Sequence, residues 1–327
     1  MIQKKIPDWN LAQGLVTAIA KNGGWVNAHS HLDRAYTITP KNLFLANASL
    51  TEKWGLVDEI KRNSTVDQIY DRMALAIEKQ LAQGVTAIGS FIDVDEIVKD
   101  KAIKAASKLR QTYKDDLEIK FINQALKGVI DLKQRQWFKE AISFVDIIGG
   151  LPKKDAGHEV EHLDILMTAA KTHHKLIHVH VDQFNDPTET ETELLIKKTQ
   201  EYGLEGKVVA IHGISLAAHP KAYRDKIAIK MNQAGIMLIT CPTAWIDSKR
   251  SEVKTVTHNS IAPIEELIAA NVTVALGTDN IADIYKPFTD GDLWTELRFL
   301  LETCHFYDLD QLVKIATSNG RKVLGIN

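Results

Sequence analysis

Apolar runs and amphipathic segments alternate along this chain from about residue 85 onward. Seven short runs rich in β-branched residues are apolar on both faces, as expected of parallel strands covered by helices. They span residues 85–94, 118–126, 145–151, 176–182, 208–214, 236–243 and 273–279. An eighth run of this kind, residues 24–32, lies earlier in the chain. The pattern therefore predicts eight buried strands.

The segments between the runs have the period of helices. In residues 65–84, apolar side chains recur every four positions and share one helix face: Ile69, Met73, Ile77 and Leu81. Gly84 suits the end of that helix, because glycine readily adopts the conformation of a C-terminal cap. Eight strand–helix units in about 300 residues predict the α/β class and a (β/α)8 TIM barrel. The alternative is a doubly wound open sheet, but HLDRAY after the first strand lacks the glycines of its phosphate turn.

The connection between the first two strands, residues 33–64, is unusually long and contains Trp54. Long loops in compact domains often act as lids. We interpret this segment either as a lid-like insertion over the barrel mouth or as an extra packing element. No internal repeat, low-complexity tract or linker divides the sequence, so we expect residues 1–327 to form a single barrel domain.

Composition excludes several classes of protein. Hydrophobic residues make up 45% of the chain and charged residues 25%, which rules out a disordered chain, a collagen-like repeat and a membrane bundle. The formal net charge of −2 argues against a broad nucleic-acid surface, which needs clustered positive charge. The two cysteines are too few for a disulfide framework or a cysteine-rich zinc ribbon.

Targeting signals do not change this interpretation. The first residues, MIQKKIPDWN, lack the apolar stretch of a secretory signal. No apolar run reaches the roughly 18 residues of a membrane span. We therefore expect a cytoplasmic protein that acts on a small molecule and binds neither nucleic acid nor membrane. The sequence leaves the oligomeric state open, including a homo-oligomer.

Metal-compatible side chains recur at the ends of the predicted strands. His29 and His31 end the first strand, and alternation along a strand places both on one face. His180, His212 and Asp279 lie at the ends of the fifth, sixth and eighth strands. In a (β/α)8 barrel the carboxyl ends of all strands meet at one open face, where active sites form. Three histidines and an aspartate suit one divalent ion, Zn²⁺ or Fe²⁺, with a position left for water.

Two other histidine patterns carry alternative interpretations. His158 and His162 form an H-E-x-x-H sequence, the signature of zinc metalloproteases. The stretch starts a helix and lacks the later glycine and histidine of the extended signature, so we interpret it as a charged helix start. His178 lies two residues before His180 on the same strand face but deeper. We expect it to be a hydrogen-bonded core histidine rather than a ligand.

Four of the strand ends resemble those of the amidohydrolase superfamily. The matching sequences are HSHLDRA, HVHVDQFNDP, AIHGIS and LGTDN, after the first, fifth, sixth and eighth strands. The chain is most similar to the branch of cytosine deaminase and N-isopropylammelide isopropylamidohydrolase, which NQALKGVI (123–130) and VDIIGGLP (145–152) support. The resemblance spans about residues 25–326 and implies a barrel hydrolase.

The resemblance also implies roles for individual residues. His29, His31, His180 and Asp279 would bind one metal ion, and Asp279 would in addition accept the proton of the attacking water. His212 would orient that water or polarise the substrate carbonyl. Gln124 matches the family's substrate-binding glutamine. No lysine ends the fourth strand, GGLP, so the carbamylated bridge of binuclear relatives is not expected.

The sequence departs from the family pattern in three places. Gln183 stands where the deaminase has a glutamate that shuttles protons, and an amide cannot do so. Gln183 can still bind substrate. Arg34 replaces the lysine of the isopropylamidohydrolase and can bind an oxyanion or a carboxylate. Only about 24 residues precede the first strand, so the β-sandwich of family members is expected to be missing or rudimentary.

The leading functional hypothesis is a metal-dependent hydrolase of C–N bonds, either a deaminase or an amidohydrolase. Its substrate would be a small cyclic amide, amidine or aminated heterocycle. Trp245 and Tyr285, after the last two strands, are candidate walls for a flat ring, or else ordinary loop packing. Loss of the glutamate and of the sandwich motivates one alternative, a non-catalytic metal-binding barrel, and the H-E-x-x-H metalloprotease is the other.

Overall fold

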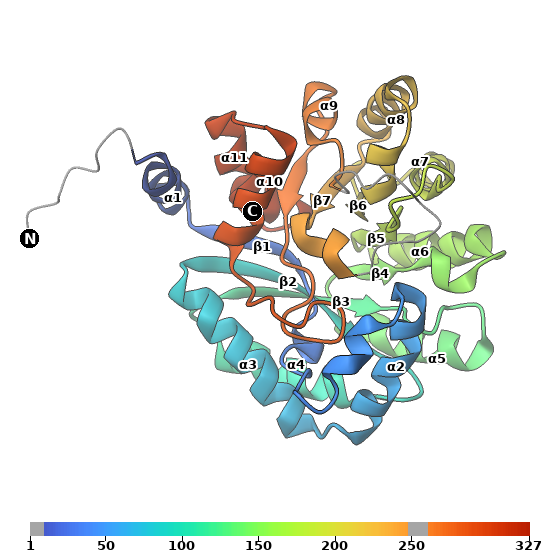
Figure 1. The fold of residues 1–327 in the computed structure, drawn as a ribbon. Coiled ribbons are helices and arrows are strands. Elements are labelled where there is room, and N and C mark those ends of the chain that lie inside the picture. The colour runs from blue at the N-terminus through green and yellow to red at the C-terminus, as the bar shows by residue number, and fades with distance from the viewer. Residues whose placement is uncertain (1–9, 248–260) are drawn as a thin grey trace, which may run out of the picture.

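Eight parallel strands form the centre of the computed structural model, which describes residues 10–247 and 261–327 (Figure 1). The strands are β1 (Trp25–Ser30), β2 (Val85–Asp93), β3 (Glu118–Gln124), β4 (Ile148–Gly150), β5 (Ile177–Val181), β6 (Val208–His212), β7 (Met237–Thr240) and β8 (Val274–Leu276). Each lies within a run predicted from the sequence. The predicted (β/α)8 barrel is confirmed.

The ring of strands closes through two short seams. Strands β1 to β3 form one sheet and β4 to β8 another. Isolated parallel bridges join them, one between Ser30 and Asp279 and one between Ile122 and Ile147. At the second seam the amide of Asn123 donates to the Gly149 carbonyl and accepts from the Gly149 N–H, both at 2.9 Å. Side-chain hydrogen bonds thus replace the backbone ladder where the strands diverge.

Helices surround the strands (Figure 1). They are α1 (Leu11–Lys21), α2 (Leu50–Asn63), α3 (Val66–Ala82), α4 (Lys101–Thr112), α5 (Leu132–Phe144), α6 (Glu159–His173), α7 (Glu191–Tyr202), α8 (Lys221–Gln233), α9 (Ile264–Ala269), α10 (Leu293–Cys304), α11 (Leu309–Ala316) and α12 (Ser318–Val323). In α3 the predicted stripe faces the core, since Ile69, Met73 and Ile77 are buried. Gly84 follows this helix at φ +85°, as a C-terminal glycine should.

Several strands are shorter than their apolar runs. The predicted strand 273–279 is regular only over Val274–Leu276, and strand 208–214 only as far as His212. His212 and Asp279 have φ values of 75° and 59°, which a strand cannot contain. The chain therefore turns at the candidate site residues themselves. Such strained conformations in non-glycine residues cluster at functional sites.

The long connection after β1 folds into three short elements. These are η1 (Leu32–Arg34) and η2 (Leu43–Asn47), both 3-10 helices, and then α2. Ser49 and Glu52 form a capping box that begins α2. The far end of α2 is anchored by ion pairs of Lys61 with Asp95 and of Lys61 with Asp93. The segment is thus a packed helical insertion rather than an irregular loop.

The two ends of the barrel differ. At the amino ends of the strands, Val323 and Leu324 of the C-terminal segment pack among residues of the barrel interior. Within residues 10–247 and 261–327 the named strands all belong to the barrel, and none builds a β-sandwich. In the same residues, no helix has the length and apolar character that crossing a bilayer requires.

Candidate active site

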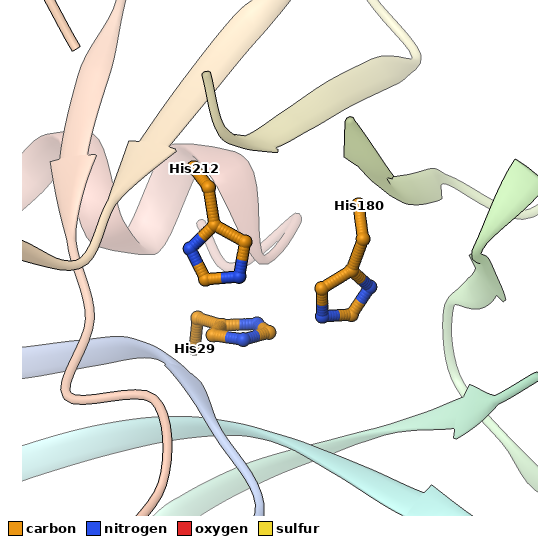
Figure 2. A group of neighbouring side chains, drawn as sticks. All are labelled: His29, His180 and His212. Carbon is orange, nitrogen blue, oxygen red and sulfur yellow. The ribbon is translucent and has the colours of Figure 1, made fainter. Parts of the chain in front are cut away.

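Five metal-compatible side chains converge at the carboxyl ends of the strands, as predicted. His29 comes from β1, His31 follows β1, His180 lies on β5, His212 ends β6 and Asp279 follows β8. In Figure 2 the rings of His29, His180 and His212 point toward one another, with centroids 5.0 to 5.5 Å apart. The Nε2 atoms of His29 and His31 lie 3.4 and 3.3 Å from Oδ1 of Asp279.

The cluster is buried and short of hydrogen-bond partners. His29 is fully buried, and the other four residues expose 6% or less of their surface. Nδ1 of His180 faces the Gly150 carbonyl at 3.2 Å, which leaves its Nε2 directed into the cluster without a partner. Nδ1 of His212 also has none. Buried polar atoms are normally satisfied, so these ring nitrogens fit a metal ion as their partner.

Burial sets the protonation of the histidines. Desolvation lowers the pKa of His29, His31 and His180, and it lowers the pKa of His212 to about 3. The imidazoles are therefore neutral near pH 7, which is the form that coordinates a metal. The phenyl ring of Phe91 packs below them, 4.7 Å from the His180 ring and 5.0 Å from the His29 ring, and keeps the floor of the site apolar.

Asp279 stays ionised despite its burial. Desolvation alone raises the pKa of this carboxyl, but the charge of Lys286 and the nearby imidazoles of His29 and His31 outweigh it and hold the pKa well below its usual value. Nζ of Lys286 lies 3.8 Å from Oδ2 of Asp279 and donates to the carbonyl of Thr278 at 2.6 Å. Sequence reasoning missed Lys286, because it lies in an irregular loop with no periodic signal.

The donor set fits a divalent ion. The ligand atoms of His29, His180 and His212 lie within 4.8 Å of one another, and so do those of His29, His31 and Asp279. Imidazole nitrogens with one carboxylate oxygen suit Zn²⁺ or Fe²⁺ better than the hard cations that require oxygen ligands. The two groups share His29, so both describe one centre.

A small cavity opens directly above this centre. His31, His180, His212 and Asp279 line it, together with three predicted substrate-binding residues and one predicted wall: Gln124, Gln183, Arg34 and Tyr285. Oε1 of Gln124 and Nε2 of Gln183 have no hydrogen-bond partner. The structure therefore brings these predicted residues together. Trp245 follows β7 in a 3-10 helix, but its side chain lies outside the described residues.

The insertion after β1 contributes to the same cavity. Leu50 and Trp54, both on α2, form part of its lining. The sequence drew attention to Trp54 but not to Leu50. Asp93, at the end of β2, contacts Lys61 and Arg34 beneath the cavity, at 3.4 and 3.8 Å. Its place at a strand end is the signal that could have identified it.

The remaining histidine patterns have structural roles. His158 is the residue before α6, and its side chain is largely exposed. His162 is buried, and both of its ring nitrogens are used, Nδ1 by Asp155 at 2.7 Å and Nε2 by the Leu151 N–H at 3.2 Å. Neither belongs to a group of candidate ligands in the described residues. The structure thus disfavours the metalloprotease. Nε2 of His178 faces the Val323 carbonyl at 2.8 Å, as expected of a core histidine.

Comparisons with known proteins identify the family of the chain. Residues 23–327 match the model of the amidohydrolase family. An uncharacterised protein of Haemophilus influenzae is 52% identical over 254 residues, which are 76% of this chain and 92% of that protein. The N-isopropylammelide isopropyl amidohydrolase of Pseudomonas sp. is 26% identical over 314 residues, 93% of this chain and 74% of that enzyme.

The solved structures support the same fold. A 5-methylcytosine deaminase from Klebsiella pneumoniae, bound to 5-fluorocytosine, superposes with a TM-score of 0.85 at 23% identity. The match covers 92% of this chain and 74% of that one. The resemblance inferred from the strand ends is confirmed: the chain belongs to the amidohydrolase family.

Proposed function

We propose that this protein is a mononuclear metal-dependent hydrolase of a C–N bond in a small cyclic amide, amidine or aminated heterocycle. The observation that carries the proposal is the convergence of four neutral histidines and one ionised aspartate on the floor of a cavity lined by two glutamine amides. The relatives named above act on N-isopropylammelide and 5-methylcytosine, which are nitrogen heterocycles.

In this proposal His29, His31, His180 and Asp279 hold one Zn²⁺ or Fe²⁺ ion. The bound ion would supply a Lewis acid that brings the pKa of water toward about 7. Asp279 accepts the proton of the attacking water, because its own pKa is held low enough for it to be a base at neutral pH. The same carboxyl then returns the proton to the departing nitrogen.

His212 and the two glutamines would position the substrate. The buried imidazole of His212 is neutral, so it can donate one hydrogen bond to the oxygen on which charge develops. Gln124 and Gln183 present an unpaired acceptor and an unpaired donor to the ring. Lys286 is a positioning residue, since it holds the ionised form of Asp279 without reaching the cavity lining.

The end of β4 supports a single metal ion. Gly150 and Leu151 occupy the position where a bridging lysine would stand. A Cβ on Gly150 would lie 2.2 Å from Cδ1 of Leu166, so no longer side chain fits there without repacking. The proposal therefore does not include a carbamylated lysine.

Gln183 favours an amidohydrolase over a cytosine-type deaminase. Proton transfer to a ring nitrogen needs a group that ionises, and an amide does not. The remaining proton carriers at the cavity are Asp279 and His212. A reaction that needs only one proton delivered to one leaving nitrogen suits this set.

Helix α2 is proposed as a lid. The cavity is narrow, with a volume of about 30 Å³. Leu50 and Trp54 of α2 line it, so movement of this helix would widen the space for a ring. The helix is held to the barrel by the buried apolar side chains of Leu50, Trp54 and Val57 and by ion pairs, including Asp58 with Lys127 at 2.6 Å.

Elemental analysis and a substrate screen test the proposal. We expect about one Zn or Fe per chain and turnover of at least one aminated or amidic heterocycle. The Asp279→Asn variant keeps the size of the side chain but cannot accept a proton, so turnover should fall by about 10³-fold or more with an unchanged circular dichroism spectrum. Bound metal without turnover of any compound would favour the non-catalytic barrel instead. Full activity of Asp279→Asn would refute the assigned base.

A further inference from the structure

Arg34 is a buried cation with unpaired hydrogen-bond donors. It lies in η1, just after the metal-compatible residues of β1, and its side chain lines the cavity above them. Only 5% of the residue is exposed, and both Nε and Nη1 are buried without a hydrogen-bond partner. A guanidinium carries five N–H donors and no acceptor. Leaving such donors unpaired in a buried position is costly.

The neighbouring acids balance the charge of Arg34 without using its N–H groups. Oδ1 of Asp93 lies 3.8 Å from Nη1, beyond hydrogen-bond distance. The Asp33 carboxylate instead accepts from the backbone N–H of Asp93 at 2.7 Å. Asp95 pairs with Lys61. These contacts keep the guanidinium charged and in place, and its donors stay available.

The surroundings also place Arg34 close to an aromatic ring. The guanidinium carbon lies 5.3 Å from the ring centre of Tyr285, which is a cation–π distance. Nζ of Lys53, a fully buried residue on α2, lies 5.9 Å from the same ring. Two buried cations therefore lie near the ring of Tyr285, and one of them comes from α2.

We infer that the substrate is an anionic heterocycle, and that Arg34 binds a carboxylate group carried by its ring. The guanidinium fork matches a carboxylate through two parallel hydrogen bonds, whereas a lone neutral carbonyl leaves part of the fork unpaired. This inference rests on the proposed function, because it assumes that the cavity above the histidines receives the substrate. The inference adds the charge of the substrate to the proposed function, because the metal centre alone does not determine that charge.

Paired ligands test the inference without relying on hydrolysis. Pyrazine-2-carboxylate and orotate are each compared with their neutral carboxamides in binding to the metal-loaded protein. Trp54, one of six tryptophans in the chain, lines the cavity, so a change in tryptophan fluorescence reports occupancy, and calorimetry gives the affinities. We expect each carboxylate to bind at least about tenfold more tightly than its carboxamide, since hydrogen bonds to charged partners are the stronger ones.

Two variants assign the preference to Arg34. Arg34→Lys keeps a positive charge beside Asp93 and should fold normally, but it loses the fork and most of the preference. Arg34→Met should abolish the preference. Arg135→Met is the matched control, because the half-buried Arg135 pairs with Glu161 and does not line the cavity. It should bind as the original protein does.

Several results would contradict the inference about Arg34. Equal binding of carboxylates and carboxamides, or no binding of either carboxylate at millimolar concentration, would overturn the inference. A preference that survives in Arg34→Lys and Arg34→Met would overturn it too, since the metal would then be the anion receptor. Bound metal and turnover of neutral heterocycles alongside any of these results would leave the proposed function intact.

Discussion

Asn123 replaces the backbone ladder where β3 meets β4, and its substitution tests how the barrel is closed. Its side-chain amide makes two buried hydrogen bonds, both to the peptide groups of Gly149 and both 2.9 Å long. Gly149 has no space for a side chain, since a Cβ there would lie 1.9 Å from the Asn123 carbonyl oxygen. In Asn123→Ala the two strands still lie close together, but one N–H and one C=O lose their partners.

The structure gives the size of the effect. Each buried peptide group left unsatisfied costs about 1–3 kcal/mol, so the pair costs about 2–6 kcal/mol. Water that enters the gap would hydrogen-bond to these peptide groups in part. We therefore expect a loss of stability in the lower half of this range, about 3 kcal/mol. The entropy of unfolding of a chain of 327 residues is about 0.7 kcal/mol per kelvin near its midpoint. The apparent melting temperature should therefore fall by about 4 °C.

Differential scanning calorimetry measures this shift directly. Asn22→Ala is the control, because its side chain makes one exposed hydrogen bond to the Ala18 carbonyl, and its loss should cost about 0.5 kcal/mol or less. The neighbouring Gln124 lines the cavity, so the KM for any substrate should also rise in Asn123→Ala. If the melting temperature of Asn123→Ala lies within 1 °C of that of the original protein (about the shift of the control), the seam does not depend on this side chain.

Three further predictions concern Gln183, the histidines of the H-E-x-x-H sequence and the titration of Glu191. Gln183→Glu should create or strongly increase cytosine deamination, measured by ammonia release; efficient deamination by the original protein would contradict the argument from the missing acid. His158→Ala and His162→Ala should both retain the metal in elemental analysis, but only His162→Ala should lower the melting temperature, since it leaves buried partners unpaired. Burial raises the pKa of Glu191 to about 7, so the folded state holds its proton more tightly than the unfolded state does. The contribution of this group to the free energy of unfolding therefore falls as pH rises from 4.5 to 7. Urea unfolding measures the difference in free energy of unfolding between Glu191→Gln and the original protein. This difference should shift by about 2 kcal/mol in favour of the variant between pH 5 and pH 8, and a difference that does not change with pH would refute the assigned shift.

The barrel and its centre could be predicted because both follow from simple rules. Parallel strands buried on both faces leave continuous apolar runs, which are visible in the sequence. Their carboxyl ends meet at one place, so a residue's position at a strand end is enough to predict convergence. His29, His180 and Asp279 needed no knowledge of the loops between them.

Residues that act through irregular structure could not be predicted in this way. Lys286 reaches Asp279 from a loop whose path no periodicity describes, and Leu50 reaches the cavity only because α2 folds back over it. Asn123 and Gly149 pair across 26 positions of sequence, and neither residue type alone predicts a seam. The sequence predicts a charged helix start at residues 158–162, but it does not predict that His162 is buried against Asp155.

The seam between β1 and β8 differs from the seam at Asn123 because it is part of the metal centre. The carbonyl of His29 accepts hydrogen bonds from the N–H groups of both Thr278 and Asp279, each at 3.0 Å, while the imidazole of the same histidine faces the Asp279 carboxylate. Gly277 permits this approach, since a Cβ there would lie 2.7 Å from Cβ of His29. Any side chain at Gly277 would push β8 from β1 and carry Asp279 away from the histidines. Stability and metal binding are therefore coupled at this seam, whereas at the β3–β4 seam a loss of stability leaves the ligands in place.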